Sequence, residues 1–305
     1  MRVFVTGATG WIGSAVVPEL IHAGHQVVGL ARSNASAEAL GAAGAETVRG
    51  SLDDLDLLEA TAAGSDGVAH LAFKHEEAFS GDFPAAVDAD RRAIEAIGAA
   101  LRGSDRPLVI ASGFAGHAAG APVTEQDAPE ADSTAGGRVL NEQAVLALAA
   151  SGVRSASLRL SPTVHGDGDT GFLAMLVAIA RQKGVAGFIG DGLNHWPAVH
   201  RLDAARLFRL AVESAPAGSV VHGAAEEGVP MRTIAEAIAR HLDVPAQSVS
   251  AEDAGEHFGW LAPFVAFDIL AESALTRERL GWEPTHPGLI EDLDQGHYFA
   301  GGAEG

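Results

Sequence analysis

Short apolar runs alternate with longer amphipathic stretches through the first half of the chain. The apolar runs have the length of strands and lie at 2–5, 26–30, 46–49, 67–71, 108–111 and 155–160. The stretches between them repeat apolar residues at helical spacing, near 12–23, 35–43, 54–63, 88–102 and 138–152. Alternating strands and helices of this kind predict an α/β fold with a doubly wound parallel sheet.

The pattern becomes less regular after about residue 161. Turn clusters at 166–169 and 190–192 interrupt it. We therefore expect a first domain over 1–161 and a smaller C-terminal substrate-binding lobe over 162–305. The stretch from about 198 to 223 has the pattern of a helix and then an apolar strand, so we expect it to return to the main sheet.

Three glycines at three-residue spacing follow the first strand, in the segment Thr6–Gly13. Gly7 permits a tight turn, Gly10 lets the backbone approach a pyrophosphate, and Gly13 lets the next helix pack close to the strand. The N-terminal amides of that helix then face the phosphates. Glycine makes up 37 of the 305 residues, so the spacing alone is weak. Strand, turn and helix in the expected order favour a Rossmann-like dinucleotide site over a glycine-rich loop that binds nothing.

The second strand ends in Ala31-Arg32-Ser33-Asn34, without the acidic residue that would bond the ribose hydroxyls of NAD. The planar, always charged guanidinium of Arg32 suits a 2′-phosphate instead. We therefore expect NADP as the cofactor. The alternative is a solvated arginine that opens a loop.

Composition restricts the class of partner. The chain has 305 residues, 47% of them hydrophobic, and a net charge of -20, which disfavours nucleic acid and anionic membranes because phosphate selects a basic face. Cysteine is absent, which excludes disulfides and thiolate chemistry. The first strand begins directly after Met1, and no apolar run reaches the roughly 18 residues of a membrane span. We expect a cytoplasmic protein without a metal site, because no histidine pair has zinc-binding helical spacing.

Several segments, in the same order, carry a resemblance to a known family. They are Thr6–Gly13, His70-Leu71-Ala72, Ser112, Arg159 with Pro162 and Gly166, 199–203 and 276–284. Together they resemble the extended and atypical short-chain dehydrogenase/reductase superfamily, the group of NAD-dependent epimerase/dehydratase-like proteins. The resemblance spans nearly the whole chain. It implies a cofactor site made of Gly7, Thr9, Gly10, Trp11, Ile12, Gly13, Arg32, Ser33, Ser51, Leu52, Leu71, Ala72, Phe73, Arg138, Pro162 and Val164.

At the active site the resemblance implies a serine or threonine, a tyrosine, and a lysine four residues after that tyrosine. The chain has one tyrosine, Tyr298, and two lysines, Lys74 and Lys183. None of them is spaced to form this Tyr-x-x-x-Lys pair. The usual proton donor of the family is therefore missing.

Counting back from Glu142, taken as the family's acidic helix residue, places Thr134 at the tyrosine position and Arg138 at the lysine position. An aliphatic hydroxyl is far less acidic than a phenol, whose pKa is about 10. Thr134 is thus a poor substitute for tyrosine, whereas Arg138 can still bond the cofactor ribose.

The proton donor must then come from another side chain at the carboxyl ends of the strands, where ligands of such sheets bind. Lys74 and His75 follow the fourth strand, and histidine titrates close to neutral pH; the alternative is a solvated loop. Ser112 follows the fifth strand at the position of the family's substrate-binding serine, or else caps a turn. The catalytic candidates are Ser112, Lys74, His75, Thr134 and Arg138.

Much of the aromatic content lies in the second half of a chain that is only 6% aromatic. This concentration favours a largely apolar small-molecule substrate, although the core of the lobe explains any one of these residues more readily. The substrate candidates are Phe114, His117, His165, His195, Trp196 and Trp260. Asp203, by contrast, should cap a helix that begins at Ala204.

These expectations combine into an NADP-dependent oxidoreductase that reduces a carbonyl or imine carbon, with Ser112 orienting the substrate and an unusual donor or water supplying the proton. Two alternatives stay open. One is a noncatalytic NADP-binding regulator or sensor, and the other is an epimerase or isomerase. Relatives often form homodimers through the helices near 88–102 and 138–152, but packing against the core explains the apolar faces of these helices equally well.

Overall fold

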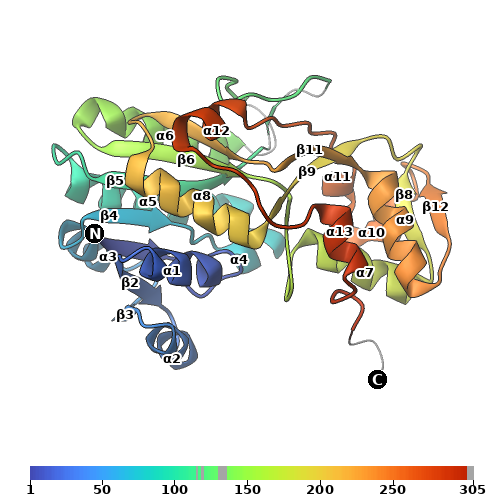
Figure 1. Ribbon diagram of the computed structural model, residues 1–305, viewed down its shortest axis with the longest axis horizontal. Helices are drawn as coiled ribbons and strands as arrows, with labels where there is room; N and C mark the ends of the chain where they lie inside the picture. The colour runs from blue at the N-terminus through green and yellow to red at the C-terminus, as the bar shows by residue number, and fades with distance from the viewer. Residues whose placement is uncertain (115, 118–119, 130–135, 301–305) are drawn as a thin grey trace.

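A parallel sheet forms the centre of the larger domain. The computed structural model describes residues 1–114, 116–117, 120–129 and 136–300. The main sheet has seven strands in the order β3-β2-β1-β4-β5-β6-β10, all parallel (Figure 1). They are β1 (Arg2–Thr6), β2 (Gln26–Ala31), β3 (Glu46–Arg49), β4 (Gly67–His70), β5 (Pro107–Gly113), β6 (Arg154–Leu160) and β10 (Ser219–Gly223). The order reverses between β1 and β4, and sheets of this kind bind ligands at the carboxyl ends of the strands beside such a reversal.

Helices cover both faces of the sheet because its inner strands are apolar on both sides. In β1, Val3 and Val5 belong to one core and Phe4 to the other, and all three are fully buried. The Val3 side is covered by α1 (Gly13–His22), α2 (Asn34–Ala42) and α8 (Arg201–Ser214). The Phe4 side is covered by α3 (Leu55–Ala63), α5 (Phe83–Leu101) and α6 (Gly136–Ala147), which continues as the 3-10 helix η1 (Leu148–Ser151).

The second lobe has its own core, which includes the fully buried Trp196. It contains a three-stranded sheet in the order β11-β9-β7 and a two-stranded sheet of β12 and β8. These strands are β7 (Thr163–His165), β8 (Ala186–Ile189), β9 (His195–His200), β11 (Glu226–Pro230) and β12 (Ala246–Val249). The helices, on the right in Figure 1, are α7 (Phe172–Lys183), α9 (Met231–Leu242), α10 (Ala254–Phe258), η2 (Gly259–Leu261), α11 (Ala262–Val265) and α13 (Leu289–Asp294).

Two further short helices belong to the larger domain. Helix α4 (His75–Phe79) follows β4 and packs against α5. Helix α12 (Ala274–Leu280) packs against α8 and β10.

The predicted fold class is confirmed. Each strand and helix expected before residue 161 is present close to its expected bounds. Downstream, α8 packs against α1, and β10 pairs with β6 in the main sheet. Residues 198–200 instead belong to β9 of the small sheet.

Asp203 does not cap a helix, so this expectation was wrong. Helix α8 begins at Arg201, and the residue before it, His200, accepts a backbone hydrogen bond from Leu202 through Nδ1 at 3.2 Å. Asp203 is buried in the first turn, where its carboxylate accepts hydrogen bonds from the backbone nitrogens at 285 and 286, each at 3.0 Å. It therefore attaches the C-terminal segment to α8.

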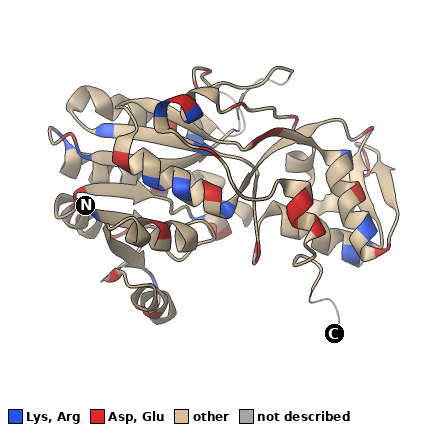
Figure 2. Cartoon of the chain, in the orientation of Figure 1, with Lys and Arg blue, Asp and Glu red and all other residues tan. Residues whose placement is uncertain are grey.

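The outer faces of the helices are polar, and charges of both signs are mixed along α8 (Figure 2). Arg209 donates from Nε to Glu19 of α1 at 2.7 Å and from a terminal nitrogen to Glu213 at 2.8 Å. Such partly exposed pairs contribute at most about 1 kcal/mol each. No helix within the described ranges is long and apolar enough to cross a membrane.

Candidate cofactor and active site

The glycine loop lies between β1 and α1, at the point where the strand order reverses. Gly7 has a φ of +65°, which favours glycine, and a Cβ there would lie 2.7 Å from the backbone nitrogen of Ala72. A Cβ at Gly13 would overlap the Gly7 carbonyl, whereas one at Gly10 would meet only that carbonyl oxygen, at 3.2 Å. Thr9 is exposed on the same loop. The loop thus combines close packing beneath it with an open outer side, as a pyrophosphate at a helix N-terminus requires.

Trp11 connects this loop to the junction of the two lobes. Its indole Nε1 donates to the carbonyl of Val164 in β7 at 2.7 Å, and the guanidinium of Arg201 lies 4.2 Å from its ring centroid. Val164 is buried, and Pro162 lies just before it, between β6 and β7. Ile12, the residue before α1, is partly buried. The loop, β7 and the start of α8 are therefore held together.

The residues expected at the adenosine end lie along the same edge of the sheet. Arg32 and Ser33 follow β2, and Ser51 and Leu52 follow β3. Arg32 is exposed, and Ser33 caps α2 by accepting a backbone hydrogen bond at 3.1 Å. Ser51 donates from its backbone nitrogen and its hydroxyl to Asp54, at 2.7 Å and 3.0 Å, and Leu52 is buried.

A series of hydrogen-bonded, buried polar side chains connects β1 to α6. Thr6 Oγ1 lies 2.9 Å from His70 Nδ1, and His70 Nε2 lies 3.1 Å from Asp90 Oδ1 on α5. Asn141 of α6 donates to the other Asp90 oxygen at 2.8 Å. At the β1 end of this series, the backbone nitrogen of Ala72 donates to Thr6 Oγ1 at 3.2 Å. Because buried polar groups cost free energy unless they are paired, this hydrogen-bonded series fixes the ends of β1 and β4 relative to α5 and α6.

Arg138, in the first turn of α6, reaches the carboxyl ends of β4 and β5. It donates to the carbonyl of Ala111, the residue before Ser112, at 2.9 Å, and its guanidinium lies 4.2 Å from the ring centroid of Phe73. Burial alone would raise the pKa of Asp90, but the hydrogen bond and charge of its histidine partner and the charge of Arg138 hold that pKa below its usual range. A fixed positive charge thus lies at this edge of the sheet, near Ser112.

Glu142, also on α6, forms a buried ion pair with Arg159, the register partner of Ser112 in β6. Arg159 donates to Glu142 Oε1 at 2.6 Å, and Ser157 donates to Oε2 at 2.8 Å. Burial alone would raise the pKa of Glu142, but Arg159 holds it below its usual range, with smaller contributions from Ser157 and Ser112. Glu142 therefore stays ionised and attaches α6 to β6. Thr134 lies outside the described residues.

Two carboxylates bind Lys74. Its Nζ lies 2.9 Å from Asp53 and 3.3 Å from Glu77. The hydrogen bond with Asp53 raises the pKa of Lys74 above its usual range despite an opposing loss of solvation. A lysine that gives up a proton during catalysis needs a lowered pKa instead. The geometry therefore favours a structural role for Lys74.

His75 has aromatic and cationic neighbours. Its ring centroid is 5.1 Å from that of Phe73 and 5.7 Å from that of Phe79. Loss of solvation lowers the pKa of His75, and the charge of Arg138 lowers it further. The lowered pKa favours the neutral imidazole, although the residue is exposed.

The six substrate candidates do not form one cluster. Trp196 and His165 are almost fully buried. The indole of Trp196 donates to the carbonyl of Phe264 at 3.2 Å, and His165 Nδ1 lies 3.0 Å from Asp292. Both side chains belong to the packing of the second lobe.

Three more candidates make local contacts near strand ends. Phe114 is buried edge-on to His222, with ring centroids 4.7 Å apart. His117 Nδ1 lies 2.9 Å from the Phe114 carbonyl oxygen. His195, at the start of β9, lies 3.0 Å from Asp268.

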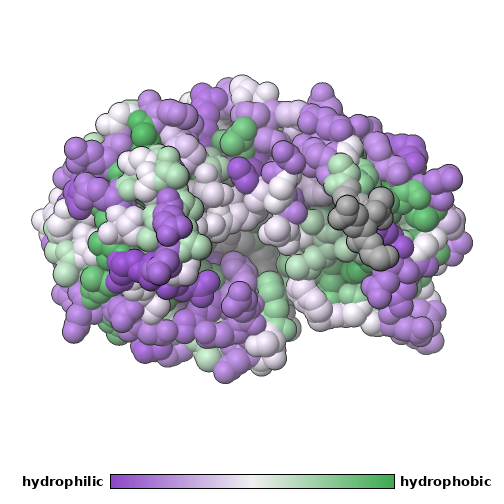
Figure 3. Space-filling view, turned by 90° about the horizontal axis from the view of Figure 1, so that it is seen from below, coloured by the Kyte–Doolittle hydropathy of each residue, from purple (hydrophilic) through white to green (hydrophobic). Residues whose placement is uncertain are grey.

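Trp260 is the candidate positioned between the lobes. Figure 3 shows a hollow that separates the two lobes on the face seen there. Trp260 of η2 is 46% exposed, and its ring centroid lies 4.6 Å from that of Phe79 of α4, which is 40% exposed. One ring comes from each lobe, so the pair bridges the space between them.

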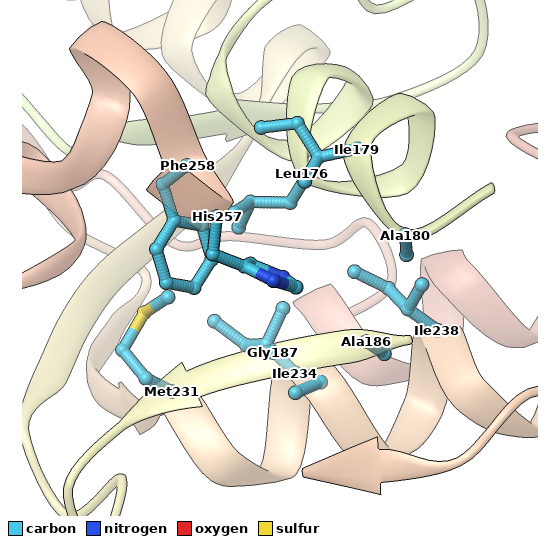
Figure 4. Close-up of a pocket in the computed structure, with 11 residues that line it drawn as sticks. Leu176, Ile179, Ala180, Ala186, Gly187, Met231, Ile234, Ile238, His257 and Phe258 are labelled. Atoms are coloured by element: carbon cyan, nitrogen blue, oxygen red, sulfur yellow. The ribbon is translucent and has the colours of Figure 1, made fainter. Parts of the chain in front are cut away.

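A small pocket in the second lobe is unrelated to the glycine loop. Aliphatic side chains of α7, β8 and α9 line it, and the imidazole of His257 points into it (Figure 4). Its volume of about 10 Å³ has room for about one water molecule. It is too small to hold a substrate.

Sequence reasoning missed Asp90 and Asn141. A signal for Asp90 was present, because it interrupts the buried stripe of α5 that contains Ala86, Ala93 and Ile97. No local pattern connects Asn141 to it, since the two residues are 51 positions apart.

Comparisons with known proteins give one matching family model, several relatives and structures with the same fold. The NAD dependent epimerase/dehydratase family matches residues 3–223. An uncharacterized protein of Schizosaccharomyces pombe is 48% identical over 98% of this chain and 100% of its own length. A 3-diazoavenalumate denitrifying reductase of a Streptomyces species is 29% identical over 96% of this chain and 99% of its own. The structure of a UDP-glucose 4-epimerase from Stenotrophomonas maltophila, with bound NAD and formylated UDP-arabinopyranose, shares the fold. Its TM-score is 0.77 at 21% identity, over 98% of this chain and 97% of that one.

Proposed function

Because this chain belongs to the NAD-dependent epimerase/dehydratase family, we propose that it is an NADP-dependent oxidoreductase that reduces a carbonyl or imine carbon of an apolar small molecule. The observation that carries the proposal is the position of Arg138. Its guanidinium lies against the Ala111 carbonyl and the Phe73 ring, next to Ser112 and at the same sheet edge as the glycine loop. The Streptomyces relative, which this chain matches over 99% of that protein's length, is named as a reductase. This supports the same class of reaction.

NADP fits the residues at the ends of β1 and β2. Gly7 and Gly13 leave no space for a Cβ, as expected of a backbone that cradles a pyrophosphate. Arg32 is exposed directly after β2, where its planar fork would pair with a 2′-phosphate. Arg138 would bond the ribose on the nicotinamide side. Bound NADPH would supply the hydride.

The chain's own residues would orient the substrate and deliver a proton. The Ser112 hydroxyl would donate a hydrogen bond to the substrate oxygen, and Arg138 would stabilise the negative charge that develops there. As hydride adds to the carbonyl carbon, the π electrons of the C=O bond move to oxygen, and one proton completes the alcohol. Of the two donor candidates, His75 is favoured in its protonated form, which is present below its lowered pKa, because carboxylates hold the proton on Lys74.

The experiment uses the purified chain loaded with NADPH and a panel of apolar aldehydes, ketones, imines and quinones. A reductase oxidises NADPH with at least one of them, with one equivalent of reduced product for each NADPH consumed. An epimerase or isomerase converts substrate with no net change in NADPH. If NADPH binds but no panel member oxidises it, the proposal fails.

A noncatalytic NADP-binding sensor is the second candidate, and Tyr298 favours it. This residue, the only tyrosine in the sequence, donates its hydroxyl to Asp169 at 3.0 Å and accepts from the backbone nitrogen of Gly166 at 3.1 Å. Burial and the charge of Asp169 raise the pKa of Tyr298 above its usual range. The hydroxyl of Tyr298 is therefore engaged by the turn at 166–169. A sensor would bind NADPH and leave it unoxidised while a ligand changes its Kd.

A further inference from the structure

A row of rings connects the candidate active site to the second lobe. It begins at Phe73, over which the Arg138 guanidinium lies at 4.2 Å. Successive centroid distances are 5.1 Å from Phe73 to His75, 5.7 Å from His75 to Phe79, and 4.6 Å from Phe79 to Trp260. The row therefore extends from the cationic edge of the sheet across the gap between the lobes.

The second lobe supports the far end of this row with further rings. The centroids of Phe172 and Phe264 lie 6.2 Å and 5.9 Å from that of Trp260 and 5.0 Å from each other. The buried Trp196 lies 5.9 Å from Phe172. These contacts hold the Trp260 ring on a packed base.

Phe79 and Trp260 are exposed to an extent that is unusual for large apolar side chains. Their exposed fractions are 40% and 46%, whereas most rings of the second lobe are buried or half-buried. They belong to the two lobes that the hollow in Figure 3 separates. Exposed apolar surface where two lobes meet is typical of a ligand site.

The acidic residues of α4 disfavour an anionic group beside this part of the row. Glu76 and Glu77 follow His75 in the first turn of α4 and are exposed. A ligand with several phosphates would meet repulsion along α4, whereas a neutral ring would not.

We propose that this row of rings is the substrate-binding surface and selects a flat aromatic aldehyde or ketone. The carbonyl group would lie at Ser112 and Arg138, and the aromatic ring would lie against the exposed surface of Phe79 and Trp260. The inference rests on the proposed reductase function. Aromatic side chains favour offset contact with another π face over contact with a saturated ring of the same carbon skeleton.

The test measures binding separately from turnover. The probes are naphthylmethanol and decahydronaphthylmethanol, which share a carbon skeleton but differ in aromaticity. Calorimetric titration into the NADPH-loaded full chain gives a Kd for each, because an alcohol cannot react with the reduced cofactor. The parent chain should bind the naphthyl alcohol about tenfold more tightly than the saturated one, the upper end for aromatic pairing.

Two variants remove the rings and keep the side chains apolar at exposed positions. Phe79→Leu and Trp260→Leu should each lower the ratio of the two Kd values clearly below the parent ratio and leave the Kd of NADPH unchanged. Leu193→Ala is the matched control, since Leu193 is 60% exposed in the same lobe and makes none of the ring contacts. It should keep the parent ratio.

The outcomes separate this inference from the reductase proposal. The inference is overturned if the leucine variants keep the parent ratio of the two Kd values. It is also overturned if the parent chain does not bind the naphthyl alcohol. Equal kcat/KM for naphthaldehyde and its saturated counterpart would also overturn it and leave the reductase standing. A ring preference in binding without oxidation of NADPH by naphthaldehyde would support the aromatic surface and overturn the reductase.

Discussion

His70 Nε2 lies 3.1 Å from Asp90 Oδ1, and both side chains are buried. Through Thr6 at one end and Asn141 at the other, this contact joins the strand before the glycine loop to the helix that carries Arg138. The cofactor loop and the candidate active site therefore share one polar support. A change of charge in that support should affect both.

Asp90→Asn tests this coupling because it keeps the size of the side chain and removes its charge. An amide has one acceptor oxygen where the carboxylate offers two, so His70 or Asn141 loses its partner. We expect the free energy of unfolding to fall by about 1–3 kcal/mol, together with weaker binding of NADP. Thermal unfolding and calorimetric titration measure the two effects. Asp88→Asn, half-exposed on the same helix, should change stability by less than about 0.5 kcal/mol; similar losses in both variants would exclude the coupling.

The buried pair of Glu142 and Arg159 predicts a stability that depends on pH. The pKa of Glu142 is lowered in the folded chain, so the carboxylate stabilises the fold above its unfolded pKa, and this contribution is lost as pH falls through the folded pKa. Glu142→Gln leaves Arg159 buried without a countercharge. We expect it to cost about 3–5 kcal/mol at neutral pH and to reduce the loss of stability on acidification.

The measurement is denaturant unfolding at several pH values. Glu95→Gln is the control, because Glu95 is exposed on α5 and pairs with Arg91. Helix-surface pairs of this kind contribute about 0.3–0.5 kcal/mol. A Glu142→Gln chain that is as stable as the control would show that the pair adds nothing beyond a surface contact.

The fold could be predicted because the main sheet depends on local pattern. Its strands are short apolar runs between amphipathic helices, and Gly7 and Gly13 have the spacing that a tight strand-to-helix turn needs. Asp203 shows where this reasoning ends. Its sequence context resembles a helix cap, but its partners lie more than 80 residues later in the chain, at 285 and 286.

The site was harder to predict because burial is decided by tertiary packing. Trp196 and His165 are of residue types that often line ligand sites, yet both are almost fully buried. Lys74 and His75 are neighbours in sequence, but carboxylates raise the pKa of one and loss of solvation lowers the pKa of the other. Neither difference is visible in the order of the residues.

Arg32→Ala tests the choice of cofactor. A guanidinium fork on a 2′-phosphate makes charge-assisted hydrogen bonds worth about 1.5–3 kcal/mol each, so the Kd of NADP should rise roughly tenfold or more. The Kd of NAD, which lacks that phosphate, should stay within about twofold, since Arg32 would have no charged group to bond. Arg102→Ala, which removes an exposed arginine just after α5, should change neither value. Equal weakening of NADP and NAD by Arg32→Ala would contradict the phosphate role.

His75→Ala tests the proton donor. If His75 protonates the substrate oxygen, its removal should lower turnover by about a hundredfold or more. Lys74→Ala should have a much smaller effect, because Asp53 and Glu77 already hold the Lys74 ammonium. His22→Ala, which removes an exposed histidine in the last turn of α1, should leave turnover unchanged. Steady-state rates of NADPH oxidation give all three comparisons.

The pH profile distinguishes proton donation by His75 from a purely structural role. A general acid must be protonated, and the pKa of His75 is lowered from its usual value near 6.5. The kcat/KM for reduction should therefore fall as pH rises through that lowered pKa, and the reverse oxidation, in which neutral imidazole accepts the proton, should rise over the same range. The residual activity of His75→Ala should lose this dependence in both directions. If the variant keeps the parent profile, water or the substrate supplies the proton, and His75 serves as one ring of the aromatic row.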